Sequence, residues 1–195
     1  MSKQVEFFFD VGSPASYLAW TQLARLRAAH GASVVLRPML LGGVFQATGN
    51  SSPVTVPAKA RYTCIDFQRY AARYGVTLRF SQHFPINTLT LMRGAVAVQR
   101  HQPERFEDYL AAMFTALWVG ARNLGDPAVV AQVLVEAGFE PDAFAAWVGD
   151  AQVKEALKSV TEEAVRRGVF GAPTFFVGDE MFFGQDRLPF VEDAL

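Results

Sequence analysis

The stretch FFFDVGSPASYL, residues 7–18, is predicted to join a strand to a helix. The apolar run that stops at Asp10 is typical of a buried strand. Pro14 is favoured at the first position of a helix, where its missing N–H has no intrahelical partner, and Ser13 is favoured at the N-cap before it. Ser13 is therefore expected at the positive end of a helix dipole, a place that stabilises an anion such as a thiolate.

Outward from this stretch, the pattern predicts a strand over 5–10, a helix over 14–30 that ends at Gly31, and a second strand over 33–38. This order indicates parallel pairing of the two strands through a right-handed crossover. Glycine, proline and serine fill residues 39–57, so regular structure is expected to lapse there. A loop of that length inside a compact domain suggests a lid or a binding loop.

Residues 58–167 are almost entirely helical in pattern. Helices are expected at 58–74, from about 87 to 100, from 103 to about 117, from 126 to 138, from 141, and over 150–167. The chain then returns to strands at 174–177 and 180–183 around a two-residue turn, and a short helix begins near Arg187. The simplest organisation is an α/β domain built from residues 1–57 and 168–195, with a helical domain, residues 58–167, inserted in it.

Composition indicates a soluble globular protein. Apolar residues make up 51% of the chain, charged residues 19%, and the net charge is -1, so nothing favours nucleic acid or an anionic membrane as a partner. No signal peptide and no membrane-spanning run is visible, which points to the cytoplasm. The single cysteine, Cys64, is expected to be a buried, apolar-like residue, and the scattered histidines lack metal-ligand spacing, so no metal site is predicted.

The order β-α-β, helical insert, β-β-α resembles the thioredoxin-like fold in its DsbA-type arrangement. Ser13-Pro14-Ala15-Ser16 stands where that fold keeps its Cys-x-x-Cys, and Gly171-Ala172-Pro173-Thr174 precedes a strand as its cis proline does. The resemblance implies a cis bond before Pro173 and a free Ala172 backbone facing a peptide-like ligand. With serine in place of both cysteines, disulfide exchange is excluded. What remains is the Ser13 hydroxyl at the start of a helix, which can stabilise the thiolate of another molecule by donating a hydrogen bond to it.

Five motifs together resemble the family of kappa-class glutathione transferases and 2-hydroxychromene-2-carboxylate isomerases. They are Asp10-x-x-Ser13-Pro14-x-Ser16-Tyr17, Gly49-Asn50, Pro57-x-Lys59, Phe170-Gly171-x-Pro173 and Phe183-Gly184-x-Asp186-Arg187. The resemblance implies glutathione as the cofactor and a homodimer as the assembly. It places Ser13, the catalytic residue, at the glutathione sulfur and Ala172 at its cysteinyl portion.

The same resemblance assigns both ends of glutathione. Asn50 and Lys59 would hold the glycyl end, and Gln185 and Asp186 the γ-glutamyl end. Gly12 and Gln185 differ from many family members, which leaves the main-chain roles intact but puts a side-chain contact from Gln185 in doubt. Each residue also has a structural interpretation: Ser13 and Asp186 as caps, Asn50 as a turn residue, Lys59 as a solvated charge.

The leading hypothesis is a glutathione-dependent isomerase of aromatic (naphthalene-like) catabolism. It would interconvert 2-hydroxychromene-2-carboxylate-type and trans-o-hydroxybenzylidenepyruvate-type compounds, because reversible thiolate addition turns a double bond into a single bond that rotates. The small aromatic substrate would lie between the two domains. One alternative is a kappa-like glutathione transferase or peroxidase. Another, from a different class, is a redox-inactive thioredoxin-like binding module.

Overall fold

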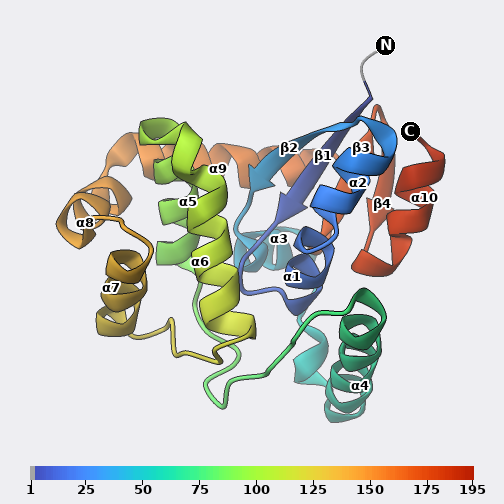
Figure 1. The fold of residues 1–195 in the computed structure, drawn as a ribbon, viewed down its shortest axis with the longest axis horizontal. Helices are drawn as coiled ribbons and strands as arrows, with labels where there is room; N and C mark the ends of the chain where they lie inside the picture. The colour runs from blue at the N-terminus through green and yellow to red at the C-terminus, as the bar shows by residue number, and fades with distance from the viewer. Residues whose placement is uncertain (1–2) are drawn as a thin grey trace.

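A computed structural model describes residues 3–195 as a four-stranded mixed sheet with helices on both faces (Figure 1). The strands β1 (Gln4–Phe9), β2 (Ser33–Pro38), β3 (Thr174–Val177) and β4 (Glu180–Phe183) lie in the order β2-β1-β3-β4. β1 pairs parallel with β2 and antiparallel with β3, and β3 and β4 form the expected hairpin. The α/β fold with a parallel first pair is confirmed. The two ends of the chain therefore build one sheet.

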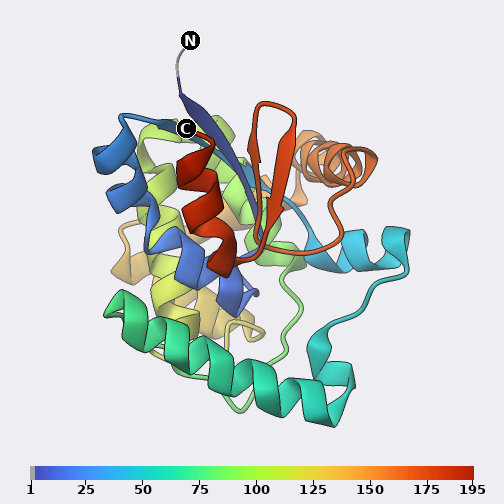
Figure 2. The same cartoon turned by 90° about the vertical axis from the view of Figure 1, so that its right-hand side faces the viewer.

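Side chains of β1 alternate between two apolar layers, as the period of a strand requires. Phe7 and Phe9 join the larger core, and Phe8 joins a second cluster on the opposite side with Met39 and Val44. Helices α1 (Pro14–Trp20), α2 (Leu23–His30) and α10 (Leu188–Asp193) cover the first face (Figure 2). Helices α3 (Leu41–Thr48) and α9 (Ala151–Arg166) cover the second. Both faces of the central strand are thus buried, which fits its continuous apolar run.

The single helix expected over residues 14–30 is two helices, so that prediction is wrong in its continuity. α1 ends at Trp20, and α2 begins at Leu23. The Thr21 hydroxyl donates to the carbonyl oxygen of Leu18 at 2.7 Å, a local bond that competes with regular helix geometry. The chain changes direction at this break, and α1, which follows directly after Ser13, is buried.

The segment 39–57 is not the irregular loop that its glycines predict. It contains α3 and a 3-10 turn, Pro53–Thr55. Gly43 lies inside α3, where an added Cβ would be 3.2 Å from the Thr161 side chain of α9. Close packing on α9 therefore overrides the poor helix propensity of glycine. α3 forms a wall of the cavity described below.

The central part of the chain is helical, as expected. It comprises α4 (Pro57–Tyr74), α5 (Leu89–His101), a 3-10 turn (Pro103–Arg105), α6 (Phe106–Trp118), α7 (Pro127–Glu136), α8 (Pro141–Gly149) and α9. α4 lies along one edge of the molecule, where it contacts α1 (Figures 1 and 2). The larger core combines side chains from strands and from α5 and α6, so the division at residues 58 and 167 stays a prediction. No helix within residues 3–195 is long and apolar enough to cross a membrane.

Candidate functional site

Ser13 occupies the N-cap of α1, as predicted. Its Oγ accepts a hydrogen bond from the Ser16 amide at 3.1 Å and donates one to the carbonyl oxygen of Ala172 at 3.1 Å. The second bond joins residues that are 159 positions apart in the sequence. Ser13 is only 4% exposed, yet it lines a cavity, so its hydroxyl lies at the boundary between the core and that space.

Ser16, the second serine of the motif, has a different environment. It is 0% exposed, its Oγ has no hydrogen-bond partner within residues 3–195, and it does not line the cavity. The two serines are therefore not equivalent. Of these two serines, Ser13 is the one that lines the cavity.

The peptide bond between Ala172 and Pro173 is cis, as the resemblance to the thioredoxin-like fold implies. It lies just before β3, and the Gly184 amide donates to the carbonyl oxygen of Pro173 at 3.0 Å. The Ala172 amide donates to no acceptor within residues 3–195, and its carbonyl oxygen is the acceptor for Ser13. A backbone edge with an N–H and a C=O therefore faces the cavity opposite the start of α1.

The structure brings all six predicted cofactor-binding residues to one cavity of about 470 Å³. These are Ser13, Asn50, Lys59, Ala172, Gln185 and Asp186. The cavity lies between the ends of β1 and β3, the α3 wall, and α4. Six phenylalanines also line it: Phe45, Phe67, Phe80, Phe84, Phe170 and Phe183. The same space therefore offers polar groups for a charged ligand and an aromatic surface for a flat one.

Asn50 follows the end of α3, Lys59 lies in α4, and both line the cavity. The Asn50 amide group donates to the carbonyl oxygen of Phe170 at 2.8 Å, while its oxygen accepts from the Ser51 amide at 2.8 Å. Asn50 thus already ties its turn to the segment before Ala172. Lys59 is in the first turn of α4, exposed, and no Asp or Glu within residues 3–195 forms an ion pair with it. Its ammonium group is available to a carboxylate.

Gln185 and Asp186 follow β4, and both line the cavity. Gly184 adopts a φ of 107°, a conformation that favours glycine, and this turns the chain into the 3-10 turn Gln185–Arg187. Gln185 is buried, and its backbone carbonyl oxygen accepts from the Tyr74 hydroxyl at 2.9 Å. Asp186 pairs with Arg187 at 2.7 Å.

Two residues differ from the interpretation of the sequence or escaped it. Cys64 is half-buried and lines the cavity, whereas the sequence predicts a buried, apolar-like residue. Asp10 is buried beside the Ser13 turn and accepts from the amides of Gly12 and Leu41 and from the Thr88 hydroxyl. Burial raises the pKa of Asp10 above its ordinary value of 3.8, and those three hydrogen bonds act in the opposite direction. In the sequence Asp10 begins the first of the five motifs, but the motif assigned no role to it.

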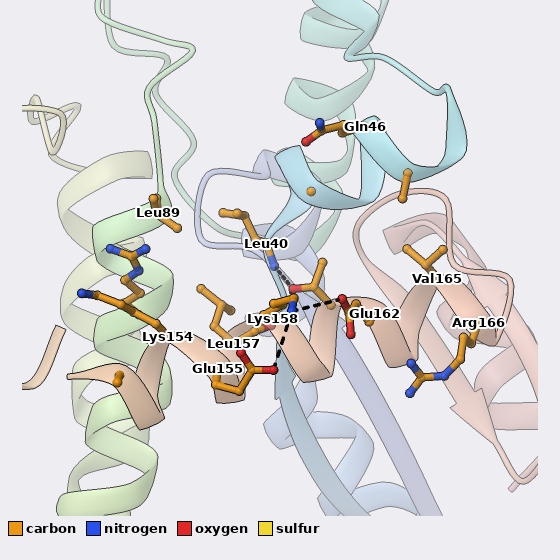
Figure 3. Close-up of a pocket in the computed structure, with 15 residues that line it drawn as sticks. Leu40, Gln46, Leu89, Lys154, Glu155, Leu157, Lys158, Glu162, Val165 and Arg166 are labelled. Carbon is orange, nitrogen blue, oxygen red and sulfur yellow. Dashed lines mark hydrogen bonds and ion pairs between the residues drawn. The ribbon is translucent and has the colours of Figure 1, made fainter. Parts of the chain in front are cut away.

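A second, wider groove of about 940 Å³ lies on the other side of α3, between α3, α5 and α9 (Figure 3). Leucine side chains form part of its lining, and Lys158 lies 3.8 Å from both Glu155 and Glu162. None of the predicted site residues reaches this groove. It meets the first cavity only through the shared α3 wall.

Comparison with known proteins agrees with this geometry. The family model described as DSBA-like thioredoxin domain matches residues 4–195. A 2-hydroxychromene-2-carboxylate isomerase of Sphingobium xenophagum is 30% identical over 100% of this chain and 99% of its own. Human glutathione S-transferase kappa 1 is 27% identical over 100% of this chain and 92% of its own.

A solved structure gives the same result in three dimensions. The structure of a 2-hydroxychromene-2-carboxylate isomerase superposes with a TM-score of 0.87 and 31% identity, covering 98% of this chain and 93% of that one. Identity of this level over nearly full length places the chain among enzymes rather than among proteins that share only a fold. The chain belongs to the DSBA-like thioredoxin family and, within it, to the enzyme family of 2-hydroxychromene-2-carboxylate isomerases and kappa-class glutathione transferases.

Proposed function

We propose that this protein is a glutathione-dependent isomerase that interconverts 2-hydroxychromene-2-carboxylate-type and trans-o-hydroxybenzylidenepyruvate-type compounds in aromatic catabolism. The observation that carries the proposal is the Ser13 hydroxyl at the N-terminus of α1, hydrogen-bonded to Ala172 next to a cis proline, in a cavity that phenylalanines help to line. The near full-length relation to isomerases supports the choice of reaction.

The residues of the cavity fit glutathione by charge and by hydrogen bonding. Glutathione carries a carboxylate at one end, an ammonium and a carboxylate at the other, and peptide groups between them. Lys59 would hold the glycyl carboxylate and Asp186 the ammonium, since both residues line the cavity and carry charges opposite to those groups. The free Ala172 amide would pair with the peptide part between them. Asn50 would position the Phe170 segment through the bond that it already makes.

Ser13 can change hydrogen-bond partner without leaving an unsatisfied group. Its Oγ keeps the bond from the Ser16 amide, and its proton rotates from the Ala172 carbonyl oxygen to the sulfur. The vacated carbonyl oxygen then accepts the ligand's own cysteinyl N–H. A hydroxyl proton and the α1 dipole together would lower the pKa of a bound thiol.

When bound, glutathione supplies a thiolate that adds reversibly to a conjugated double bond and so permits rotation. The residues of the protein would position the thiolate and the substrate and would exclude water from them. Phe45, Phe67, Phe80 and Phe84 line the cavity in which a planar aromatic substrate would lie. Excluding water there would strengthen the electrostatic effect of Ser13 on the sulfur.

A Ser13→Ala variant tests the role of the hydroxyl. We expect turnover to fall by about 10²-fold, the usual consequence of losing one donor to a developing or bound anion. Glutathione affinity, measured by calorimetry, should change little because both charged ends keep their partners. Ser33→Ala, an exposed serine at the start of β2, is the matched control. A Ser13→Ala protein that isomerises as fast as the parent would overturn the assignment.

The same measurements separate the alternatives. A transferase or peroxidase would bind glutathione but act on electrophiles or peroxides instead, and the relation to kappa-class transferases makes this the second candidate. Assay of all three substrate classes with one preparation distinguishes them. A redox-inactive binding module predicts no glutathione binding, and that result would refute both enzymatic functions.

We also propose a homodimer that works in the cytoplasm. The outer face of α4 exposes two large apolar side chains, Tyr62 at 62% and Ile65 at 55%, and such patches mark interaction surfaces. A free, half-buried cysteine suits a reducing compartment. Sedimentation of the parent against Ile65→Glu tests the dimer: a parent that sediments as a monomer would refute it.

A further inference from the structure

Asp10 is a buried carboxyl group that no cation neutralises within residues 3–195. It is 1% exposed and directly precedes the turn that carries Ser13. Its Oδ1 accepts from the Gly12 amide at 2.9 Å, and its Oδ2 accepts from the Leu41 amide at 2.9 Å and the Thr88 hydroxyl at 3.0 Å. Burying a carboxyl group without an ion pair is costly, and here hydrogen bonds from the protein alone offset that cost.

The three donors come from three different segments. Gly12 belongs to the turn between β1 and α1, Leu41 is the first residue of α3, and Thr88 is the N-cap of α5. The N-cap of α3, Leu40, has no side chain that can cap the helix. Asp10 takes one amide at this helix start, and Thr161 of α9 accepts the Leu40 amide at 3.0 Å, drawn as a dashed line in Figure 3. A single carboxyl group thus connects the Ser13 turn, the cavity wall and the first helix turn of α5.

We propose that Asp10 is a positioning residue of the candidate site, holding the Gly12–Ser13 turn against the start of α3. It thereby sets the spacing between the Ser13 hydroxyl and the cavity wall formed by Leu41 and Phe45. The catalytic consequence of this inference rests on the proposed function, because it concerns the bound glutathione sulfur. Its structural consequence does not.

Substitution of Asp10 by asparagine distinguishes a positioning role from an effect of charge, because the two predict opposite changes in the pKa of the bound thiol. A carboxylate near the sulfur raises the pKa of the bound thiol, so removal of that charge alone would lower it. Positioning predicts the reverse. The asparagine side chain has one acceptor oxygen, and its NH2 group would face an amide donor of either Gly12 or Leu41. The Gly12–Ser13 turn would shift, and the Ser13 hydroxyl would no longer point at the sulfur.

The experiment measures the pKa of bound glutathione by ultraviolet absorbance of its thiolate, together with kcat and KM. In Asp10→Asn we expect that pKa to rise by about one pH unit, the size of one lost hydrogen bond to an anion. We expect kcat to fall about tenfold, with KM for glutathione changing less than about threefold, since Lys59 and Asp186 are untouched. A lower or unchanged thiol pKa overturns the inference.

Two further comparisons exclude a general loosening of the fold. Thr161→Val removes the other acceptor at the start of α3 but leaves the Gly12 bond, so it should leave the thiol pKa at the parent value. Thr88→Val should raise that pKa, and Thr88→Ser, which keeps the hydroxyl, should restore it. These variants also decide the matter if Asp10→Asn does not fold: equal values for Thr88→Val and Thr88→Ser would contradict the proposal.

Amide hydrogen exchange in the free protein keeps the two proposals separable. The Gly12 and Leu41 amides should be protected together in the parent, and Asp10→Asn should expose at least one of them. If the parent binds no glutathione, the proposed function fails and the exchange result alone decides the role of Asp10. Continued protection of both amides in Asp10→Asn would overturn that role.

Discussion

Gly12→Ala tests how closely the Ser13 turn approaches α5. Gly12 is not in the left-handed region, so its requirement is one of space. An added Cβ would lie 2.5 Å from Cγ2 of Thr88 and 3.3 Å from Oδ1 of Asp10. Overpacking of this kind costs about 1–3 kcal/mol. Alanine also lowers the conformational entropy of the unfolded chain, which stabilises the folded state by about 0.4–1 kcal/mol. The net loss in the free energy of unfolding is therefore about 1–2 kcal/mol.

A second substitution, at Thr88, should relieve this overpacking. Thr88→Ser deletes the Cγ2 that the new methyl group would meet, while it keeps the hydroxyl that donates to Asp10. Alone it should cost about 0.8 kcal/mol, the value of one buried methyl group. Combined with Gly12→Ala it should remove most of the overpacking, so the double-mutant cycle should show a favourable coupling of about 1–2 kcal/mol.

Urea and thermal unfolding, followed by circular dichroism, measure these values. Gly12→Ala should lower Tm by about 3–6 °C for a chain of this size. Gly42→Ala is the matched control: an added Cβ has no neighbour within 4 Å inside α3, so the variant should be more stable by about 0.5–1 kcal/mol. If Gly12→Ala costs the same with Thr88 and with serine at position 88, the turn is not limited by contact with α5 and the reasoning is wrong.

Two further predictions concern buried hydroxyl groups. Ser16→Ala should raise the free energy of unfolding by about 1 kcal/mol, because the Ser16 Oγ is buried without a partner within residues 3–195; a lower Tm would contradict this. Burial raises the pKa of Tyr74 from 10.0 to about 12, so its stabilisation is complete below pH 10 and is lost as pH rises towards 12. Tyr74→Phe should be less stable at neutral pH, having lost the bond to Gln185, but should lose less stability between pH 10 and 12. Parallel curves for the two proteins would refute the assignment.

The sequence predicted the elements whose signals are local. Proline at the first helical position and serine or aspartate before it mark the starts of α1 and α7, and Gly31 and Gly75 end α2 and α4 in the left-handed conformation. These signals need only neighbouring residues, because a cap satisfies amides and carbonyls of its own helix turn. The order of strands and helices then restricts the fold to very few topologies.

The same sequence failed where distant contacts decide the local conformation. α3 looked like a loop because it begins with leucine and two glycines, and its start is satisfied by Asp10 and Thr161, which come from other parts of the chain. The break after α1 is accompanied by a local bond from the Thr21 hydroxyl to the Leu18 carbonyl oxygen. Residues 15–30 contain no glycine or proline that would predict this break.

The candidate site divides in the same way. Ser13 and its helix end could be predicted from residues 7–18, since a proline and a cap are enough to fix them. The tertiary structure alone brings Ser13 within hydrogen-bonding distance of Ala172 and shows that Ser16 faces the core instead. It alone shows that Asp10 connects the turn to α3 and α5. The physical reason is that capping is short-range, whereas the burial of a group depends on which distant segments pack against it.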